Sequence, residues 1–363
     1  MKIATLTQQH QKFSCCTLLI PLICALAALY CGCQGETFNL DVGGTSEIIE
    51  KSGELTENEV WDGRIYITDT LIVPEGITLT IRSGTIVGFE PIDTPSHIIV
   101  RGELYAEGSP ERMIVFGSLG RMREDQHDPS EIDAHLPPLT SDFGTMGMEE
   151  NISTDTQVTL TADPPKAGDW GGIQIEAESP NSRLTYCRIQ HATAGITTRT
   201  DAVQIERCLF SENKTGVLSE NTSPTITSNE FNRNGTGTQF RGGASPDVEY
   251  NEFTANNYGI ICEDDARPRI QYNILRANYE NAIVCYSTAS PEIVSNNITL
   301  NVGWAVYDGG RLRDNFIQGN KQIGPNITEL GTGTQSDQFY GVDEAYEPRN
   351  SPVTEAGVPR ENF

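Results

Sequence analysis

Two adjacent aspartates, with an arginine beside them and a third aspartate farther along, are the residues best suited to chemistry: Asp264, Asp265, Arg267 and Asp308. Carboxylate oxygens bind Ca²⁺, and a basic group beside a bound acidic sugar is what a polysaccharide lyase needs. The same stretch, CEDDARPR, is also typical of a charged turn. Both interpretations stay open. Calcium is the one cofactor that the first of them calls for, and no Cys/His spacing indicates another metal site.

These candidates lie in a chain that repeats itself. Pro224, Pro246, Pro268 and Pro291 recur at spacings of 22, 22 and 23 residues. Two apolar columns share the period: Leu184, Ile205, Ile226, Val248, Ile270, Ile293, Leu312, and Ile189, Phe210, Phe231, Phe253, Leu275, Ile298, Ile317. Short runs of β-branched and aromatic residues, broken by Asn, Gly and Pro, predict strands separated by tight turns. Repeats of this length stack into a solenoid.

Asparagines follow the same period in two columns: Asn229, Asn251, Asn273, Asn296, Asn315, and Asn213, Asn234, Asn256, Asn278, Asn301, Asn320. An amide both donates and accepts, so we predict that each column is a structural ladder from coil to coil. Asparagine also tolerates the left-handed backbone of a turn. A column of small residues predicts another turn: Gly195, Gly216, Gly237, Gly259, Ala282 and Ala305.

The predicted fold is therefore all-β, a right-handed parallel β-helix with coils of about 22 residues, whose equivalent strands lie roughly 4.8 Å apart. Four cysteines obey the period in two pairs, Cys187 with Cys208 and Cys262 with Cys285. That separation is compatible with a disulfide in each pair, and equally with stacked, buried thiols.

The N-terminal region is typical of an export signal. Lys2 and Lys12 precede the apolar run CTLLIPLICALAALY, which is short for a membrane span. The sequence ALYCGCQGE that ends the run resembles a bacterial lipoprotein signal, with Cys33 as the predicted lipidation site and Cys31 as the alternative. Cleavage as an ordinary signal peptide, without lipid, is the other interpretation.

Four segments carry a resemblance to a known superfamily: LTIRSGTIVGF, VRGELYAEGSP, GDWGGIQI and YCRIQHATAGI. They resemble secreted bacterial right-handed β-helix proteins of the pectin-lyase-like superfamily. The resemblance implies the fold strongly and the function weakly, because such proteins include lyases, glycoside hydrolases and adhesins. The GHG and RIK motifs of polygalacturonase-like hydrolases are missing from this sequence.

These patterns divide the chain into six segments. We predict a signal peptide at 1–33, a linker at 34–54, first coils at 55–117, an acidic inserted loop at 118–167, main repeats at 168–325, and a C-terminal tail or cap at 326–363. An insertion without a period often marks the binding face of a solenoid, so we expect the loop to take part in binding. Trp170, just after the loop, is either a platform for a sugar ring or a buried packing residue.

The net charge of the chain restricts the classes of partner that it can bind. The formal net charge of −25 disfavours nucleic acid, and any membrane contact would be through the lipid anchor. The first hypothesis is a non-catalytic, exported lipoprotein that binds a glycan or a protein at the bacterial cell envelope, on the outer membrane or cell surface, or in the periplasm. The alternatives are a polysaccharide lyase or glycoside hydrolase, and a structural spacer. The sequence does not indicate an oligomeric state.

Overall fold

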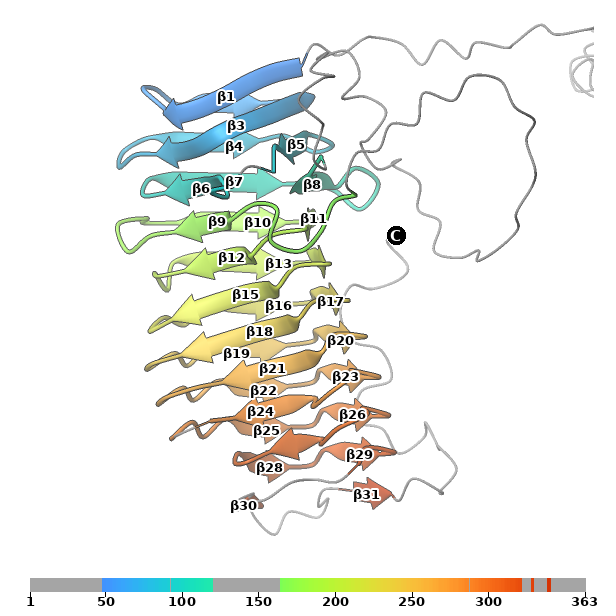
Figure 1. Cartoon of the computed structure of the whole chain (residues 1–363). Coiled ribbons are helices and arrows are strands. Elements are labelled where there is room, and N and C mark those ends of the chain that lie inside the picture. Colours follow the sequence, from blue (N-terminus) through green and yellow to red (C-terminus); the bar gives the residue numbers. More distant parts are fainter. Residues whose placement is uncertain are drawn as a thin grey trace, which may run out of the picture. The chain divides into compact units, whose positions relative to one another are not determined.

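The computed structural model describes residues 48–91, 93–119, 164–286, 288–321, 328–329 and 338–340. Within them every regular element is a β-strand, and the strands wind into a column of stacked coils (Figure 1). Each strand pairs in parallel with its equivalent in the next coil. No helix in this part of the chain is long and apolar enough to cross a membrane. The predicted all-β solenoid is confirmed.

The column has three strand faces, and face 1 is an 11-stranded parallel sheet. Its strands are β2 (Glu59–Trp61), β4 (Thr78–Ile81), β7 (Glu103–Glu107), β10 (Ser182–Thr185), β13 (Val203–Glu206), β16 (Thr225–Thr227), β19 (Asp247–Glu249), β22 (Arg269–Gln271), β25 (Glu292–Val294), β28 (Arg311–Arg313) and β30 (Thr328–Glu329).

Faces 2 and 3 are joined at the first coils by β1 (Ile48–Glu54) and β3 (Arg64–Val73), which run across both. Face 2 continues with β5 (Ile86–Phe89), β8 (Ile114–Ser118), β11 (Cys187–Gln190), β14 (Leu209–Ser211), β17 (Glu230–Asn232), β20 (Glu252–Thr254), β23 (Ile274–Arg276), β26 (Asn297–Thr299), β29 (Phe316–Gln318) and β31 (Gln338–Tyr340). Face 3 continues with β6 (His97–Val100), β9 (Gly172–Ile175), β12 (Ala194–Thr198), β15 (Thr215–Glu220), β18 (Thr236–Arg241), β21 (Tyr258–Cys262), β24 (Ile283–Cys285) and β27 (Val306–Tyr307).

The first strand corrects one predicted boundary. β1 begins at Ile48, inside the segment that the sequence predicted as a linker. Its backbone pairs with β3 from Ile48 to Glu54. The segment lacks the alternating apolar pattern that would have revealed a strand, because most of its side chains are exposed.

The core is the interior of the column, filled by the inward side chains of all three faces. Phe210, Phe231 and Phe253 stack on one another with ring centroids 4.8 and 4.7 Å apart. The central residues of the face 1 strands, such as Ile226 and Val248, are fully buried. Because each coil repeats the same contacts, the apolar columns predicted from the sequence form one continuous core.

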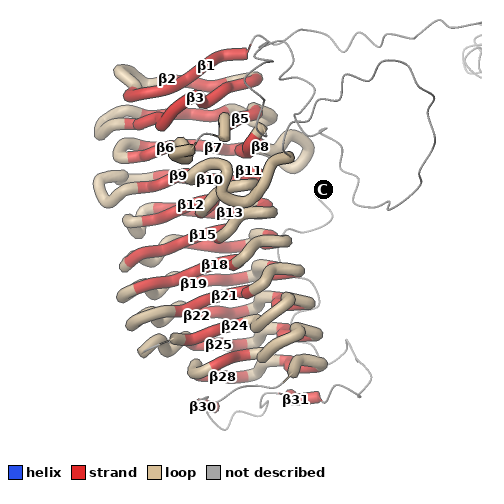
Figure 2. The backbone as a smooth tube through the Cα atoms, viewed as in Figure 1, coloured by secondary structure: helices blue, strands red, loops and turns tan. Residues whose placement is uncertain are grey.

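Both asparagine ladders are confirmed, and all of their members are buried. In each column the Nδ2 of one asparagine donates to the Oδ1 of the next at 2.8 to 3.1 Å, without a break from Asn213 to Asn320 or from Asn229 to Asn315. Nδ2 also donates to the carbonyl of the preceding coil, as from Asn251 to Ile226. The ladders therefore satisfy backbone groups at two tight corners of the coils from Asn213 to Asn320. Figure 2 shows these corners as loops between the stacked strands.

The backbone reason offered for asparagine was wrong, since the left-handed residue is the one before it. Ser228 and Tyr250, which precede Asn229 and Asn251, have φ of 57° and 56°, and the ladder asparagines are absent from the left-handed set. The side-chain amide, and not the backbone conformation, selects asparagine here.

The small-residue column was predicted as a turn and instead lies in or at the start of face 3 strands. Gly216 is in β15 and Gly237 is in β18. A Cβ at Gly237 would lie 2.5 Å from the carbonyl oxygen of Gly259 and 2.6 Å from the Phe253 ring. The column is small because the phenylalanine stack passes directly beside it.

Candidate functional site

The predicted acidic candidates do not form one site. Asp264, Asp265 and Arg267 are exposed on the turn between β21 and β22, and Thr288 of the next coil donates to the Asp265 carboxylate at 2.6 Å. Asp308 follows β27, two coils beyond β21. Two coils separate strands by roughly 10 Å. No group of three or more His, Cys, Asp or Glu in the described coils could hold a metal ion.

The four periodic cysteines are buried and free. Cys262 lies opposite Cys285 in the register between β21 and β24. Burial, followed by the neighbouring thiol, raises the pKa of Cys262 and of Cys187. Of the two alternatives from the sequence, stacked thiols are what this structure contains, and they are not poised as nucleophiles.

The insertion is held at its base by one buried carboxylate. Asp169 accepts from the Ser118 hydroxyl at 2.8 Å and from the Lys166 backbone N–H at 2.9 Å, so it joins the strand before the insertion to the chain after it. Trp170 is fully buried, stacks on Phe89 with centroids 3.9 Å apart, and donates from Nε1 to the Gln190 carbonyl. Of its two predicted roles, packing is the one that the structure shows, because no ring face is accessible to a sugar.

Replacing Asp169 by Ala is expected to destabilise the protein by about 1 to 3 kcal/mol, since a buried hydroxyl and a buried N–H lose their acceptor. Urea unfolding measures the change. Asp247→Ala removes an exposed acid from β19 and serves as the control, with a change within about 0.5 kcal/mol. A loss no greater than that of the control would show that Asp169 does not hold the base of the insertion.

A second titratable group of residues lies at the corner between faces 2 and 3. His191, Glu212 and Arg233 occupy the same left-handed corner position in successive coils, with φ of 65°, 55° and 55°. Nε2 of His191 is 3.5 Å from the Glu212 carboxylate, and this contact holds the pKa of Glu212 below its ordinary value. His191, Glu212 and Arg233 therefore contact one another between equivalent positions of successive coils, and we assign this row of side chains a structural role.

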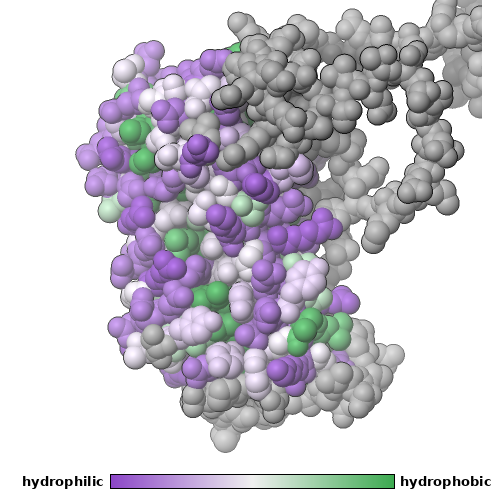
Figure 3. Space-filling view, viewed as in Figure 1, coloured by the Kyte–Doolittle hydropathy of each residue, from purple (hydrophilic) through white to green (hydrophobic). Residues whose placement is uncertain are grey.

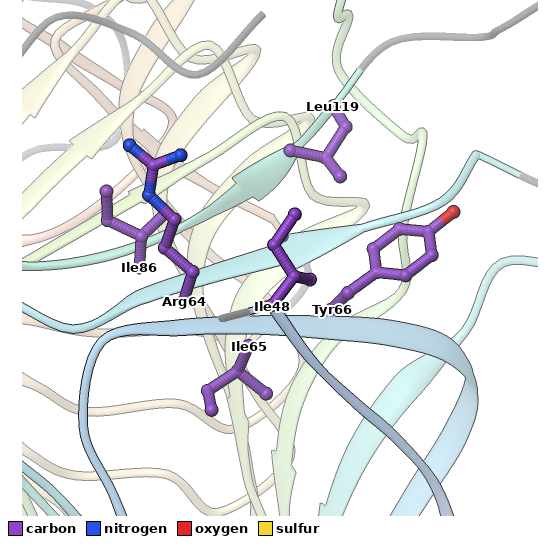
Figure 4. Close-up of a pocket in the computed structure, with 7 residues that line it drawn as sticks. Ile48, Arg64, Ile65, Tyr66, Ile86 and Leu119 are labelled. Atoms are coloured by element: carbon purple, nitrogen blue, oxygen red, sulfur yellow. The ribbon is translucent and has the colours of Figure 1, made fainter. Parts of the chain in front are cut away.

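A small pocket lies outside the first coils of face 2 (Figure 4). Ile48, Tyr66 and Leu119 lie around it, with the arginine side chain of Arg64 at one side. Its total empty volume, open solvent included, is about 230 Å³. Burial and the carboxylates of Glu90 and Glu50 raise the pKa of Tyr66, so the phenol stays neutral. The pocket offers little beyond apolar contact.

The most distinctive surface is on face 3, on the coils of β21, β24 and β27. The central outward column there runs Gln174, Thr197, Leu218, Gln239, Ile261, Val284 and Tyr307. Leu218 is apolar too, but from Ile261 onward every member is apolar or aromatic, with Ile261 and Val284 buried and Tyr307 half-buried. We call Tyr258, Tyr286, Tyr307 and Trp304, together with Ile261 and Val284, the aromatic patch.

The rings of the patch lie close to one another. Trp304 and Tyr307 have ring centroids 6.0 Å apart, tilted by 48°, and the Lys321 ammonium lies 5.5 Å from the Trp304 ring centre. Burial, and then the neighbouring Tyr258, Glu263 and Tyr307, raise the pKa of Tyr286. Figure 3 shows green apolar side chains and pale rings exposed over these coils, among purple hydrophilic ones.

The edge of face 3 carries an alternating row of charges. Arg199 bridges Glu176 at 2.8 Å and Glu220 at 3.0 Å, which are its equivalents in the coils before and after. Arg241 pairs with Glu263 at 2.8 Å in the same way. The row is balanced along β9 to β18, and its next member beyond Glu263 is Tyr286, at the edge of the patch.

Sequence reasoning missed the aromatic patch. Tyr286 and Tyr307 are 21 residues apart but occupy different columns, so they give no repeat signal. The available signal was the change in the outward column from Gln239 to Ile261, Val284 and Tyr307. Three other predicted features lie outside the described residues: the lipidation site Cys33, nearly all of the acidic loop, and nearly all of the C-terminal tail.

Comparisons with known proteins agree with this fold. Residues 170–322 match the family model of a right handed beta helix region. No curated protein matches the sequence. A solved mutant of the periplasmic alginate epimerase AlgG is 12% identical with a TM-score of 0.51, over 83% of this chain and 71% of that chain.

Two further solved structures are more distant. Tailspike protein 3 of bacteriophage CBA120 is 12% identical with a TM-score of 0.38, over 86% of this chain and 57% of that one. An exopolygalacturonase from Thermotoga maritima is 10% identical with a TM-score of 0.33, over 77% and 84%. Such identities show a shared fold alone. The strand register and the family match together show that this chain has a right-handed parallel β-helix fold.

Proposed function

We propose that this protein binds a glycan along face 3 and does not cleave it. The observation that carries the proposal is the aromatic patch, where exposed Tyr286 and three half-buried aromatic side chains lie about the buried Ile261 and Val284. The flat C–H faces of sugar rings pack against aromatic rings, and phenol and indole groups add hydrogen bonds at the rim. Monomeric proteins rarely expose such a cluster without a binding role.

The rest of face 3 suits an extended polymer. Toward the N-terminal coils the outward column presents the half-buried amides of Gln174 and Gln239. Such groups bond sugar hydroxyls, and their regular spacing matches a ligand that also repeats. A polysaccharide lying parallel to the column axis would therefore meet polar groups first and the aromatic patch at one end.

Binding without cleavage is favoured by where the acidic candidates lie. Asp264 and Asp265 sit on a turn and Asp308 lies two coils away. Catalytic carboxylates are held in a cleft beside the cleaved bond, whereas Asp264 and Asp265 are exposed on their turn and Asp265 accepts from Thr288. The chain shares its fold with an alginate epimerase, which makes a polysaccharide lyase or hydrolase the alternative function. A spacer is disfavoured by the patch.

We further propose that the protein acts at the bacterial cell envelope. The support is the N-terminal sequence, where a basic start and an apolar run lead to Cys33 in the setting of a lipoprotein signal. A lipid on Cys33 would tether the protein to a membrane of the envelope, where surface glycans are available as ligands. An envelope protein as the partner remains the alternative to a glycan.

Trp304→Ala and Tyr286→Ala are each expected to weaken glycan binding about tenfold, because each removes one stacking surface worth roughly 1 to 2 kcal/mol. Affinity electrophoresis against a panel of polysaccharides identifies a ligand, and isothermal titration measures the change. Tyr250→Ala is the matched control, since Tyr250 is 45% exposed against 42% for Tyr286 but lies at the corner of faces 1 and 2.

Equal losses in Tyr250→Ala and Tyr286→Ala would refute face 3 as the site. New reducing ends released from any bound polysaccharide by the intact protein would replace the binding proposal with the enzyme alternative. Circular dichroism of each variant checks that the strand spectrum is kept.

A further inference from the structure

We propose that the aromatic patch selects neutral glycans over glycans that carry uronic acids. This inference rests on the proposed binding function and names the chemical class of its ligand. It comes from the charges that surround the patch, which differ from those along the rest of face 3. The aromatic rings can stack on any sugar, so we assign the choice between neutral and charged glycans to the charged side chains around the patch.

Carboxylates border the patch at both ends of its strands. Glu263, Asp264 and Asp265 follow β21, and Glu263 acts directly on the Tyr286 phenol. At the other end the exposed Glu280 is anchored next to Trp304 in the backbone, since its carbonyl accepts from the backbone N–H of Gly303. Asp308 follows Tyr307 at the end of β27. Acidic residues are thus next to three of the four rings.

Two of the nearby cations are engaged, since Arg241 is bound to Glu263 at 2.8 Å and Lys321 lies over the Trp304 ring. Arg267 is a third cation, exposed on the same turn as Asp264 and Asp265. Farther toward the N-terminus, Arg199 balances Glu176 and Glu220. The acidic excess is therefore concentrated where the aromatic rings are.

A polyuronate carries one carboxylate per sugar, and each would enter a border where carboxylates outnumber cations. Like charges a few ångströms apart near a protein surface repel each other more strongly than in bulk water. The chain as a whole adds repulsion at long range, with a formal net charge of −25. A neutral glycan meets none of these penalties and keeps the full stacking contact.

The test compares matched polysaccharides that differ in charge: methyl-esterified galacturonan with polygalacturonate, and hydroxyethyl cellulose with carboxymethyl cellulose. Affinity is measured at low and at high salt with the full chain. We expect the neutral member of a bound pair to bind at least tenfold more tightly at low salt, where charges act over roughly 20 to 30 Å. High salt should narrow the gap while leaving neutral binding nearly constant.

A charge variant, Asp264→Asn with Glu280→Gln, is expected to raise the ratio of charged to neutral affinity at least fivefold at low salt. Asparagine is well tolerated at the left-handed φ of 54° that Asp264 adopts. The matched control, Asp247→Asn with Glu111→Gln, removes the same charge from exposed sites away from face 3 and should leave the ratio unchanged.

The outcomes separate the two proposals. Charged members that bind as tightly as neutral ones at low salt would overturn the selectivity while leaving glycan binding in place. A ratio that rises equally in the control would assign the effect to net charge and overturn the role of the border. Failure of every polysaccharide to bind would overturn the proposed function and this inference together.

Discussion

The Asn251→Leu variant is expected to lose about 3 to 5 kcal/mol of folding free energy, because several buried polar groups lose their partners at once. The Oδ1 of Asn251 accepts from the backbone N–H and the Nδ2 of Asn229, at 2.9 and 3.1 Å. Its Nδ2 donates to the Ile226 carbonyl at 3.0 Å and to Asn273 at 3.1 Å. Leucine fills a similar volume but satisfies none of these groups.

Asn257→Leu is the matched control for the ladder. Asn257 comes directly after the ladder residue Asn256, and its side chain is exposed. Its loss should change stability by no more than about 0.5 kcal/mol. Urea unfolding followed by far-ultraviolet circular dichroism compares the two variants. Similar stabilities for both would show that the ladder adds nothing to the packing of the core.

Gly172→Ala is expected to be more damaging still, by at least about 4 kcal/mol or through failure to fold. Gly172 has φ of 110°, a conformation that L-residues rarely adopt. A Cβ there would lie 1.6 Å from the carbonyl oxygen of Ala194 in the next coil. Neither the backbone of β9 nor that of β12 can retreat without breaking the ladder of hydrogen bonds between them.

Gly243→Ala gives the comparison for Gly172→Ala. Gly243 has no atom within 4 Å of an added Cβ and no left-handed φ, so alanine there should be neutral or slightly stabilising. Soluble yield and thermal midpoint of the two variants are the measurements. A Gly172→Ala protein as stable as Gly243→Ala would mean that β9 and β12 pack less closely than in this structure.

The repeat explains why so much of the fold was predictable. In a solenoid each coil contacts its equivalents, so a residue type that suits one position recurs at a fixed spacing, as Asn229, Asn251 and Asn273 do. The sequence spacing then specifies the spatial neighbour directly. The same logic failed for β1, whose exposed side chains carry no pattern.

The candidate site was not predictable in this way, because it depends on residues that do not repeat. The outward column does not repeat one residue type, so Ile261, Val284 and Tyr307 stand where earlier coils have Gln174, Thr197 and Gln239. Only the strand register shows that these three residues share a column. Only the folded structure shows that the Trp304 and Tyr307 rings are 6.0 Å apart. The sequence instead drew attention to Asp264 and Asp308, which lie on different coils.

What the sequence determined by itself is the solenoid: its all-β class, its period, its apolar columns and its two asparagine ladders, because each is a local choice repeated at one spacing. The tertiary structure decided three things that the spacing left open. It buried Trp170 against Phe89, made Asp169 the link across the base of the insertion, and gathered aromatic side chains beside an acidic border on face 3. Each depends on contacts between unlike residues from different coils, whose meeting is fixed by the register of the strands and by no pattern along the chain.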